Sequence, residues 1–119
     1  MPREIAIVGA GLCGNLLAIL LARRDYRVTV YEQGPDPAAS TAAAGRSINL
    51  ALAARGIRAL EQAEVFDDVR GLLLPMTGRI VHRRDGEQRL LPYGQHRDER
   101  IWSVSRSALN RCLQRIARD

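Results

Sequence analysis

The chain has 119 residues, of which 46% are hydrophobic and 26% are charged, the ordinary balance of a globular protein. This length allows one modest domain and excludes two full domains. No apolar run is long enough to cross a membrane, and the N-terminal residues lead straight into an apolar stretch. We therefore expect neither a membrane segment nor a signal peptide.

The net charge of +5 raises the question of a nucleic-acid partner. All 18 basic residues are arginines, and they are spread along the chain near acids, without interleaved aromatic residues. Nucleic-acid binding requires a basic stripe on one face, so we interpret the arginines as a solvated surface. Cys13 and Cys112 stand in unrelated contexts and indicate a reducing compartment, here the cytoplasm. No Cys/His spacing resembles a metal site.

The first segment has the pattern of a βαβ unit. Residues Ile5–Val8 form a short, β-branched apolar run that predicts a buried strand. Apolar residues then recur at helical spacing from Leu16 to Leu21, with no proline to interrupt them. A second strand is predicted over Arg27–Tyr31, and an acid, Glu32, follows it directly.

Three glycines in the pattern Gly-x-Gly-x-x-Gly connect the first strand to the helix. Gly9 lets the chain turn tightly, Gly11 lets a pyrophosphate approach the backbone, and Gly14 lets the helix pack close to the strand. Glu32, which lies 18 residues after Gly14, can accept hydrogen bonds from ribose hydroxyls. The pattern predicts a dinucleotide site; the alternative is a βα turn that needs small residues and binds nothing.

The middle of the chain is predicted to contain a loop and two helices. Residues Gln33–Ala44 include two prolines, a glycine and many small residues, which are typical of a loop. A short extended segment at Ser47–Leu50 leads into a helix that ends near Gln62. A second short helix is predicted over Glu64–Leu73, and it ends before Pro75.

The following segment changes to short alternating strands. Residues Gly78–Arg83 predict a strand, Arg84–Glu87 its turn, and Gln88–Leu91 the return strand. Pro92–Gly94 interrupts the pattern, and Ile101–Val104 predicts a further short strand.

The last segment is predicted to be a helix. Ser105 is a good N-cap for a helix that begins at Arg106 or Ser107 and ends at Ala117. Its apolar face is formed by Leu109, Cys112, Leu113 and Ile116. The elements together indicate an α/β fold: a Rossmann-like, dinucleotide-binding βαβ unit followed by helices and a small antiparallel sheet segment. Further parallel strands are not obvious, so we expect an N-terminal portion of a larger fold.

Four ordered motifs add to the opening unit. They are Gly45–Gly56 (GRSINLALAARG), Pro75–His82 (PMTGRIVH), Pro92–Gly94 (PYG) and Ile101–Asn110 (IWSVSRSALN). With the opening unit, they resemble the flavin-dependent aromatic hydroxylases, and within that family the kynurenine 3-monooxygenases. The resemblance covers nearly the whole chain but only the first part of such an enzyme.

The resemblance implies a domain organisation and an activity. Residues 1–75 would hold the βαβ unit and the following helices of an FAD-binding domain, 76–104 the first substrate-domain strands, and 105–119 a helix that returns to the FAD-binding domain. The activity implied is hydroxylation of L-kynurenine to 3-hydroxykynurenine with FAD, NADPH and dioxygen, through a C4a-hydroperoxyflavin. Because the flavin performs the oxygen chemistry, no catalytic side chain is expected in this stretch. The 119-residue piece alone is expected to be inactive.

The resemblance also implies roles for individual residues. The FAD-binding positions are Gly9, Gly11, Leu12, Cys13, Gly14, Tyr31, Glu32, Gln33, Gly34, Arg46, Ala51 and Arg106. Arg79 and Tyr93 match the pair that holds the amino-acid carboxylate of the substrate. A guanidinium fork suits a carboxylate, and a phenol hydroxyl can add a third donor.

Several of these residues have a structural alternative. Arg46 could be solvated or cap a helix end, and Arg79 could pair with Glu87 across the hairpin. Tyr93 could be a packed loop aromatic, and Arg106 could face water in the first turn of its helix, where it would slightly oppose the helix dipole. We interpret His82 and Cys112 as structural residues, and Trp102 as a core or interface residue.

Two other functions remain open from the sequence. An NAD-dependent dehydrogenase would use the same glycine loop and acid, although it would more often continue with further βα units. A truncated, non-catalytic nucleotide-binding module would also show a single βαβ unit. Bound flavin in the intact protein would separate the first alternative from a hydroxylase.

Overall fold

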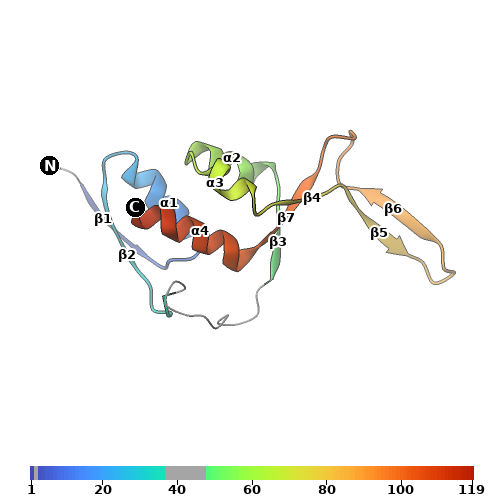
Figure 1. Ribbon diagram of the computed structural model, residues 1–119, viewed down its shortest axis with the longest axis horizontal. Helices are drawn as coiled ribbons and strands as arrows, with labels where there is room; N and C mark the ends of the chain where they lie inside the picture. Colours follow the sequence, from blue (N-terminus) through green and yellow to red (C-terminus); the bar gives the residue numbers. More distant parts are fainter. Residues whose placement is uncertain (2, 37–47) are drawn as a thin grey trace.

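The computed structural model describes residues 1, 3–36 and 48–119, so the predictions for Arg46 and Ser47 lie outside the described residues. In chain order the elements are β1 (Glu4–Val8), α1 (Leu12–Ala22), β2 (Arg27–Tyr31), β3 (Asn49–Leu52), α2 (Ala54–Gln62), α3 (Phe66–Arg70), β4 (Leu74–Met76), β5 (Gly78–His82), β6 (Gln88–Pro92), β7 (Ile101–Ser105) and α4 (Arg106–Arg118). The molecule is elongated, with extents of 65 × 33 × 21 Å. The helices and the β1–β2 pair form one end, and the β5–β6 pair projects from the other (Figure 1).

Strands β1 and β2 pair in parallel and are joined by α1, which confirms the predicted βαβ unit. Parallel neighbours need such a crossover, because a tight turn can join only antiparallel strands. Ile7 lies opposite Val30, and Val8 lies opposite Tyr31. Side chains alternate along a strand, so one face of the pair carries the buried and half-buried residues Ile5, Ile7, Val28 and Val30.

Strand β7 is the centre of a three-stranded antiparallel sheet with the order β3–β7–β4. Leu50 of β3 lies opposite Val104, and Pro75 of β4 lies opposite Trp102. The extended segment predicted at Ser47–Leu50 begins two residues before β3. The sequence does not predict β4, because Pro75 indicates only the end of a helix. A proline is tolerated there because β4 is an edge strand of this sheet, where a missing N–H costs no ladder bond on the open side.

Strands β5 and β6 form the predicted antiparallel hairpin, with Ile80 opposite Leu90. Its turn is closed by two backbone hydrogen bonds, from the Arg83 N–H to the Glu87 carbonyl at 2.9 Å and from the Gly86 N–H to the Arg83 carbonyl at 3.0 Å. His82, at the end of β5, is exposed. His82, which the sequence analysis interprets as structural, therefore has no place in the core, because the hairpin points away from the rest of the described structure (Figure 1).

The hydrophobic core lies among the helices and β7. Its buried members are Ile19, Leu60, Ala63, Val65, Val69, Leu73, Val104, Leu109, Cys112 and Leu113. Helices α1 and α4 come from opposite ends of the chain and pack side by side (Figure 1). The predicted apolar face of α4 is confirmed, and Trp102 packs against the core as a partly buried residue.

Two helix ends agree with the prediction from the sequence, and one helix is shorter than predicted. The Ser105 side chain accepts a hydrogen bond from the Ala108 N–H at 3.4 Å, which confirms it as the N-cap of α4. Helix α2 ends at Gln62, as predicted. Helix α3 is shorter than predicted, because the N–H groups of Leu72 and Leu73 bond to carbonyls three residues back and tighten the chain into a turn.

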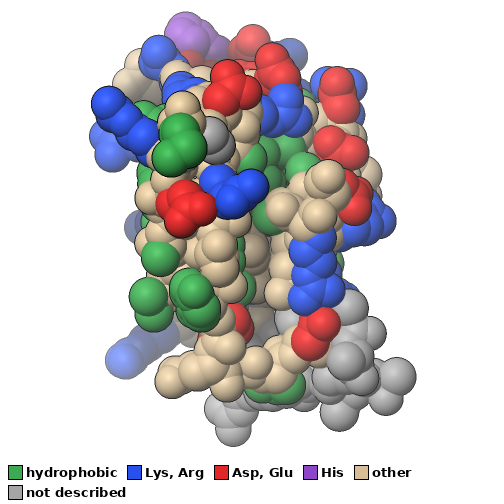
Figure 2. Space-filling view, turned by 90° about the vertical axis from the view of Figure 1, so that its left-hand side faces the viewer, with side chains coloured by type: hydrophobic (Ala, Val, Ile, Leu, Met, Phe, Trp, Pro, Cys, Tyr) green, Lys and Arg blue, Asp and Glu red, His purple; other side chains and the backbone are tan. Residues whose placement is uncertain are grey.

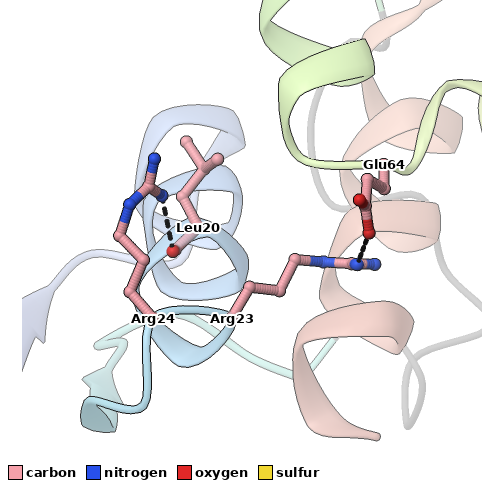
Figure 3. Close-up of polar contacts among 4 residues, drawn as sticks. All are labelled: Leu20, Arg23, Arg24 and Glu64. Carbon is pink, nitrogen blue, oxygen red and sulfur yellow. Dashed lines mark hydrogen bonds and ion pairs between the residues drawn. The ribbon is translucent and has the colours of Figure 1, made fainter.

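An ion pair links α1 to the α2–α3 turn. The Arg23 guanidinium contacts the Glu64 carboxylate, while the neighbouring Arg24 turns away and donates to the Leu20 carbonyl at 2.9 Å (Figure 3). Both members of the pair are exposed, so the pair contributes about 1 kcal/mol or less. Core packing, rather than this contact, therefore sets the arrangement of the helices.

The face of the β1–β2 pair opposite the helices is open to solvent among the described residues. Val8 is 88% exposed and Tyr31 is 60% exposed. Figure 2 shows this end of the molecule, where hydrophobic side chains lie at the surface among arginines and acids. Within the described ranges, no helix is both long enough and apolar enough to span a membrane.

Candidate dinucleotide-binding site

The glycine loop leaves β1 through a turn that only glycine adopts readily. Gly9 has φ +105°, and its N–H donates to the carbonyl of Tyr31 at the end of β2 at 2.7 Å. The loop is therefore anchored to the neighbouring strand at its first residue. This geometry confirms the predicted tight turn.

The other two glycines differ in what surrounds them. A Cβ on Gly14 would lie 1.9 Å from the Gly9 carbonyl oxygen, so the close approach of α1 to β1 excludes any side chain there. A Cβ on Gly11 would meet nothing within 4 Å. Gly11 precedes α1, so the space in front of it faces the positive end of the helix, where an anionic group is stabilised.

Glu32 closes the site at the end of β2. Its carboxylate accepts a hydrogen bond from the Ala10 N–H at 2.7 Å and another from the Gly34 N–H at 3.0 Å. These bonds, first that from Gly34 and then that from Ala10, lower the pKa of Glu32 below its ordinary value. Glu32 is therefore a carboxylate at neutral pH, with acceptor capacity left for hydroxyl groups.

A hollow of about 400 Å³ lies beside this carboxylate. It is lined by Ala10, Val28, Val30, Glu32, Gly34, Pro35, Asp36, Gln114, Ala117 and Arg118. An ion pair between Asp36 and Arg118, 3.0 Å long, joins the loop after β2 to the last turn of α4 at its margin. The hollow thus combines apolar side chains such as Val28 and Val30 with the Glu32 carboxylate and the Asp36–Arg118 pair, a mixed lining that suits the adenosine end of a dinucleotide.

Two asparagines hold the loop from the helix side, and the sequence analysis assigns no role to either of them. Asn15 in α1 is only 2% exposed, and its amide donates to the Ala10 carbonyl at 2.9 Å and to the Asn110 side-chain oxygen at 3.0 Å. The Asn110 amide in α4 donates to the same carbonyl at 3.1 Å. A polar residue within the apolar run of α1 was the available signal, because buried amides are retained where they have partners.

The remaining loop positions have mixed surroundings. Leu12 is half-buried against the core, so its side chain has a packing role. Cys13, in the first turn of α1, is exposed. Gln33 is also exposed, and the carbonyl of Tyr31 is engaged by Gly9.

The positions matched to the flavin end lie apart from the glycine loop in sequence. Ala51 of β3 is exposed and lies opposite Ser103 of β7. The Arg106 side chain, at the start of α4, is exposed, and its backbone N–H donates to the Ile48 carbonyl at 3.0 Å. Arg46 lies outside the described residues.

Arg79, matched to the substrate carboxylate, lies in β5, and Tyr93, matched to the same group, directly follows β6. Arg79 is opposite Leu91, and the Tyr93 N–H donates to the Thr77 carbonyl at 3.0 Å. Glu87 pairs with Arg83 at 3.1 Å, and within the described ranges Arg79 forms no ion pair. The alternative of an Arg79–Glu87 pair is therefore wrong. Tyr93 does lie in a loop, the one after β6, and it is 44% exposed.

The described residues offer no metal centre. No group of three or more His, Cys, Asp or Glu side chains in this part of the chain is arranged to hold a metal ion. The donor set instead fits a dinucleotide, with an open backbone at Gly11, a helix N-terminus and a carboxylate held in place.

Comparison with curated proteins gives relatives across almost the whole chain. It is 51% identical over 115 residues to a kynurenine 3-monooxygenase of Stenotrophomonas maltophilia, which covers 97% of this chain and 25% of the relative. It is 50% identical over 116 residues to a kynurenine 3-monooxygenase of Xanthomonas euvesicatoria pv. vesicatoria, which covers 98% of this chain and 26% of that relative. The chain spans about a quarter of the length of these curated relatives.

Solved structures share the fold. A 2-methyl-3-hydroxypyridine-5-carboxylic acid oxygenase matches 98% of this chain and 29% of its own, with a TM-score of 0.71 and 23% identity. A p-nitrophenol 4-monooxygenase from Pseudomonas putida matches 98% of this chain and 30% of its own, with a TM-score of 0.72 and 18% identity. At these identities the likeness establishes the fold alone.

A family model adds the classification. The model for NAD(P)-binding Rossmann-like domains matches residues 7–72, which is more than half of the chain. This range begins in β1 and ends after α3, so it contains the glycine loop, Glu32 and all of the βαβ unit except the first three residues of β1. The chain therefore belongs to the family of NAD(P)-binding Rossmann-like domains.

Proposed function

We propose that this chain is the N-terminal part of a flavin-dependent monooxygenase that hydroxylates L-kynurenine to 3-hydroxykynurenine with NADPH and dioxygen. Relatives about half identical over nearly the whole chain carry the name kynurenine 3-monooxygenase. Those relatives are about four times longer, so the proposal concerns the full-length protein.

The observation that carries the cofactor part of the proposal is the contact between Glu32 and the glycine loop. The 2.7 Å hydrogen bond from the Ala10 N–H fixes the carboxylate directly beside the open Gly11 position. A ribose on Glu32 then places its pyrophosphate at the N-terminus of α1, where backbone N–H groups stabilise the negative charge. FAD fits this arrangement through its ADP half.

The residues of this chain bind and orient rather than react. The glycine loop and α1 hold the pyrophosphate, and Glu32 holds the adenosine ribose. Bound FAD supplies the redox chemistry, accepting a hydride and activating dioxygen. Ala51, Arg46 and Arg106 are proposed to lie along the flavin, on the basis of the motifs in which they occur.

The hairpin supplies the proposed substrate contacts. Arg79 presents a guanidinium free of ion pairs within the described residues, and Tyr93 follows β6 next to the start of β5, where its N–H donates to the Thr77 carbonyl. A bidentate guanidinium–carboxylate contact, with a phenol hydroxyl as a third donor, would hold the amino-acid end of L-kynurenine. The fragment of 119 residues on its own is proposed to be inactive, since its relatives are much longer.

An NAD-dependent dehydrogenase is the second candidate. The family model that matches the chain is described by NAD(P) binding, and Glu32 accepts the ribose of NAD as readily as that of FAD. The antiparallel β3–β7–β4 sheet and the hairpin favour the monooxygenase, because a dehydrogenase more often continues with further parallel strands.

The deciding experiment is NADPH oxidation by the full-length protein with added FAD, with and without L-kynurenine. We expect a flavin spectrum in the purified protein, strong stimulation of NADPH oxidation by L-kynurenine, and a hydroxylated product. A flavin spectrum without any response to L-kynurenine would overturn the substrate. Absence of flavin together with binding of NAD would favour the dehydrogenase.

The substrate contact is tested by Arg79→Ala in the same full-length protein. Loss of a charge-assisted contact is expected to raise the KM for L-kynurenine about 10- to 100-fold. Arg84→Ala is the matched control, since Arg84 is an exposed arginine in the turn of the same hairpin. Equal KM values for the two variants would remove Arg79 from the substrate site.

A further inference from the structure

Two side-chain amides donate hydrogen bonds to the Ala10 carbonyl, which lies in the glycine loop between β1 and α1. It accepts from the Asn15 amide at 2.9 Å and from the Asn110 amide at 3.1 Å, and the two amides bond to each other at 3.0 Å. These three groups come from the loop, from α1 and from α4, with 95 residues between the two asparagines. The result is a closed triangle of hydrogen bonds behind the glycine loop.

Packing alone does not explain this triangle. Asn15 is 2% exposed among apolar neighbours of α1, where a leucine of similar size would bury more apolar surface. A buried amide is costly unless its donors and acceptor are paired. Both N–H groups of the Asn15 amide are paired, and no fully buried side-chain nitrogen or oxygen among the described residues lacks a partner.

The geometry of the peptide bond connects the triangle to the ligand side of the loop. The Ala10 carbonyl and the Gly11 N–H belong to one planar trans peptide, so they point in opposite directions. A carbonyl held inward by two amides therefore directs the Gly11 N–H outward. The Gly11 N–H has no hydrogen-bond partner among the described residues, and the space in front of Gly11 is open.

We propose that Asn15 and Asn110 are positioning residues of the dinucleotide site: they hold the Ala10 carbonyl inward and so aim the Gly11 N–H at the pyrophosphate. This inference rests on the proposed dinucleotide binding and extends it to α4, the helix that carries Asn110. Without the triangle, the Ala10–Gly11 peptide can rotate and present its carbonyl, which repels phosphate oxygens. The loop then loses one preorganised donor, and affinity falls.

The test compares the affinities of the full-length protein for FAD and for ADP, measured by fluorescence quenching and by calorimetry. ADP is included because it reaches the loop and Glu32 without the flavin end. For Asn110→Leu and Asn15→Leu, we expect the Kd of both ligands to rise about tenfold, the equivalent of one hydrogen bond. Asn110→Asp keeps the shape but lacks the amide donor, so we expect a loss at least as large.

The control and the readouts separate positioning from a structural role. Arg111→Ala alters the next residue of α4, which is exposed, and is expected to leave both Kd values unchanged. In the double variant Asn15→Leu/Asn110→Leu, the combined loss should be smaller than the product of the two single losses, because both amides act on one carbonyl. A purely structural role would lower the melting temperature of the ligand-free protein and leave the Kd of the folded fraction unchanged.

Two outcomes would overturn the inference in different ways. If the wild-type protein binds FAD and ADP, and both single variants bind them within twofold of the wild type, the positioning role is wrong while the dinucleotide site stands. If the wild-type protein binds neither ligand, the dinucleotide site falls, and the positioning role falls with it. Asn110 is only half-buried, so its variants keep the test open even if Asn15→Leu does not fold.

Discussion

At the scale of single residues, the site depends on positions where one atom more or less changes the geometry. Gly14 has no room for a methyl group, whereas a methyl group on Gly11 would enter open space. Glu32 is held by two backbone N–H groups, and Asn15 is buried with its amide group donating two hydrogen bonds. Some of these residues matter for packing and others for the proposed binding, so substitutions at them are expected to have different effects.

The two glycines give the first prediction. Gly14→Ala forces α1 away from the Gly9 carbonyl, so the free energy of unfolding should fall by about 1–3 kcal/mol in urea denaturation. Gly11→Ala should change that free energy by about 0.5 kcal/mol or less and should weaken ADP binding, because its methyl group enters the space proposed for the pyrophosphate. If Gly14→Ala proved as stable as the wild type, the close helix–strand contact would be contradicted.

The lowered pKa of Glu32 gives a prediction with a defined sign. A carboxyl group whose pKa is depressed in the folded state stabilises the protein at pH values above its ordinary pKa of 4.5. This contribution is lost as the pH falls through the lowered pKa. Glu32→Gln should therefore destabilise the protein at pH 7, and the difference should narrow below about pH 4.5. Carbon-detected NMR titration of the Glu32 carboxyl should give a pKa below 4.5, and a value above it would contradict the hydrogen bonds described.

The two cysteines should react at very different rates. Cys13 is exposed, whereas Cys112 is 8% exposed and desolvation by burial, only partly offset by the charge of Arg115, raises the pKa of its thiol. Because the thiolate is the reactive form, iodoacetamide at pH 8 should modify Cys13 well before Cys112. Peptide mass spectrometry measures both sites in one digest. Equal rates in the folded protein would show that Cys112 is not buried in the core.

At the scale of elements, some helices and strands follow from a local sequence pattern, whereas others form only where a partner strand is present. Helix α4 begins at a serine cap and ends where its apolar pattern ends, so its bounds follow from the sequence. The β5–β6 hairpin likewise follows from alternation and a turn. Strand β4 is different, since its short segment becomes a strand only because β7 provides a partner.

The hairpin should be the least protected strand pair in the isolated chain. Ile80 and Leu90 are directly opposite each other and both exposed, whereas β7 is paired on both edges and carries the buried Val104. A two-stranded hairpin without a covered face is marginally stable. Hydrogen exchange should give lower protection factors for β5–β6 amides than for β7 amides. Equal protection would mean that another element covers the hairpin.

At the scale of the whole molecule, the chain is more extended than a domain of its size. The radius of gyration is 17.7 Å, against about 13–14 Å for a compact domain of about 120 residues. The projecting hairpin and the open outer face of β1–β2 both contribute to this shape (Figure 1). Apolar side chains such as Val8 and Tyr31 are left at the surface as a result.

This exposed face should promote self-association of the isolated 119-residue chain. Val8→Lys removes the most exposed aliphatic side chain of β1 and adds a charge, so sedimentation should show a larger monomer fraction. Thr29→Lys is the matched control, because Thr29 shares this face of the sheet and the same charge is added without removing an apolar group. If the two variants behave alike, or neither differs from the wild type, the apolar face is not the cause of association.

The sequence by itself determined the βαβ unit, the glycine turn, Glu32 and the cap of α4. Each of these depends on residues close together in the chain: a periodicity, a glycine without a side chain, or a hydroxyl three residues from an N–H. Local patterns of this kind survive without knowledge of the rest of the fold.

Only the tertiary structure decided how distant segments meet. Three features depend on which surfaces pack together. They are the pairing of β4 with β7, the exposure of His82, and the contact of Asn15 and Asn110 with the Ala10 carbonyl. Hydrogen bonding and burial between remote residues carry no local periodicity, so one sequence does not reveal them. The packing of α4 against α1 is what brings Asn110, in the last helix, into contact with the Ala10 carbonyl of the glycine loop.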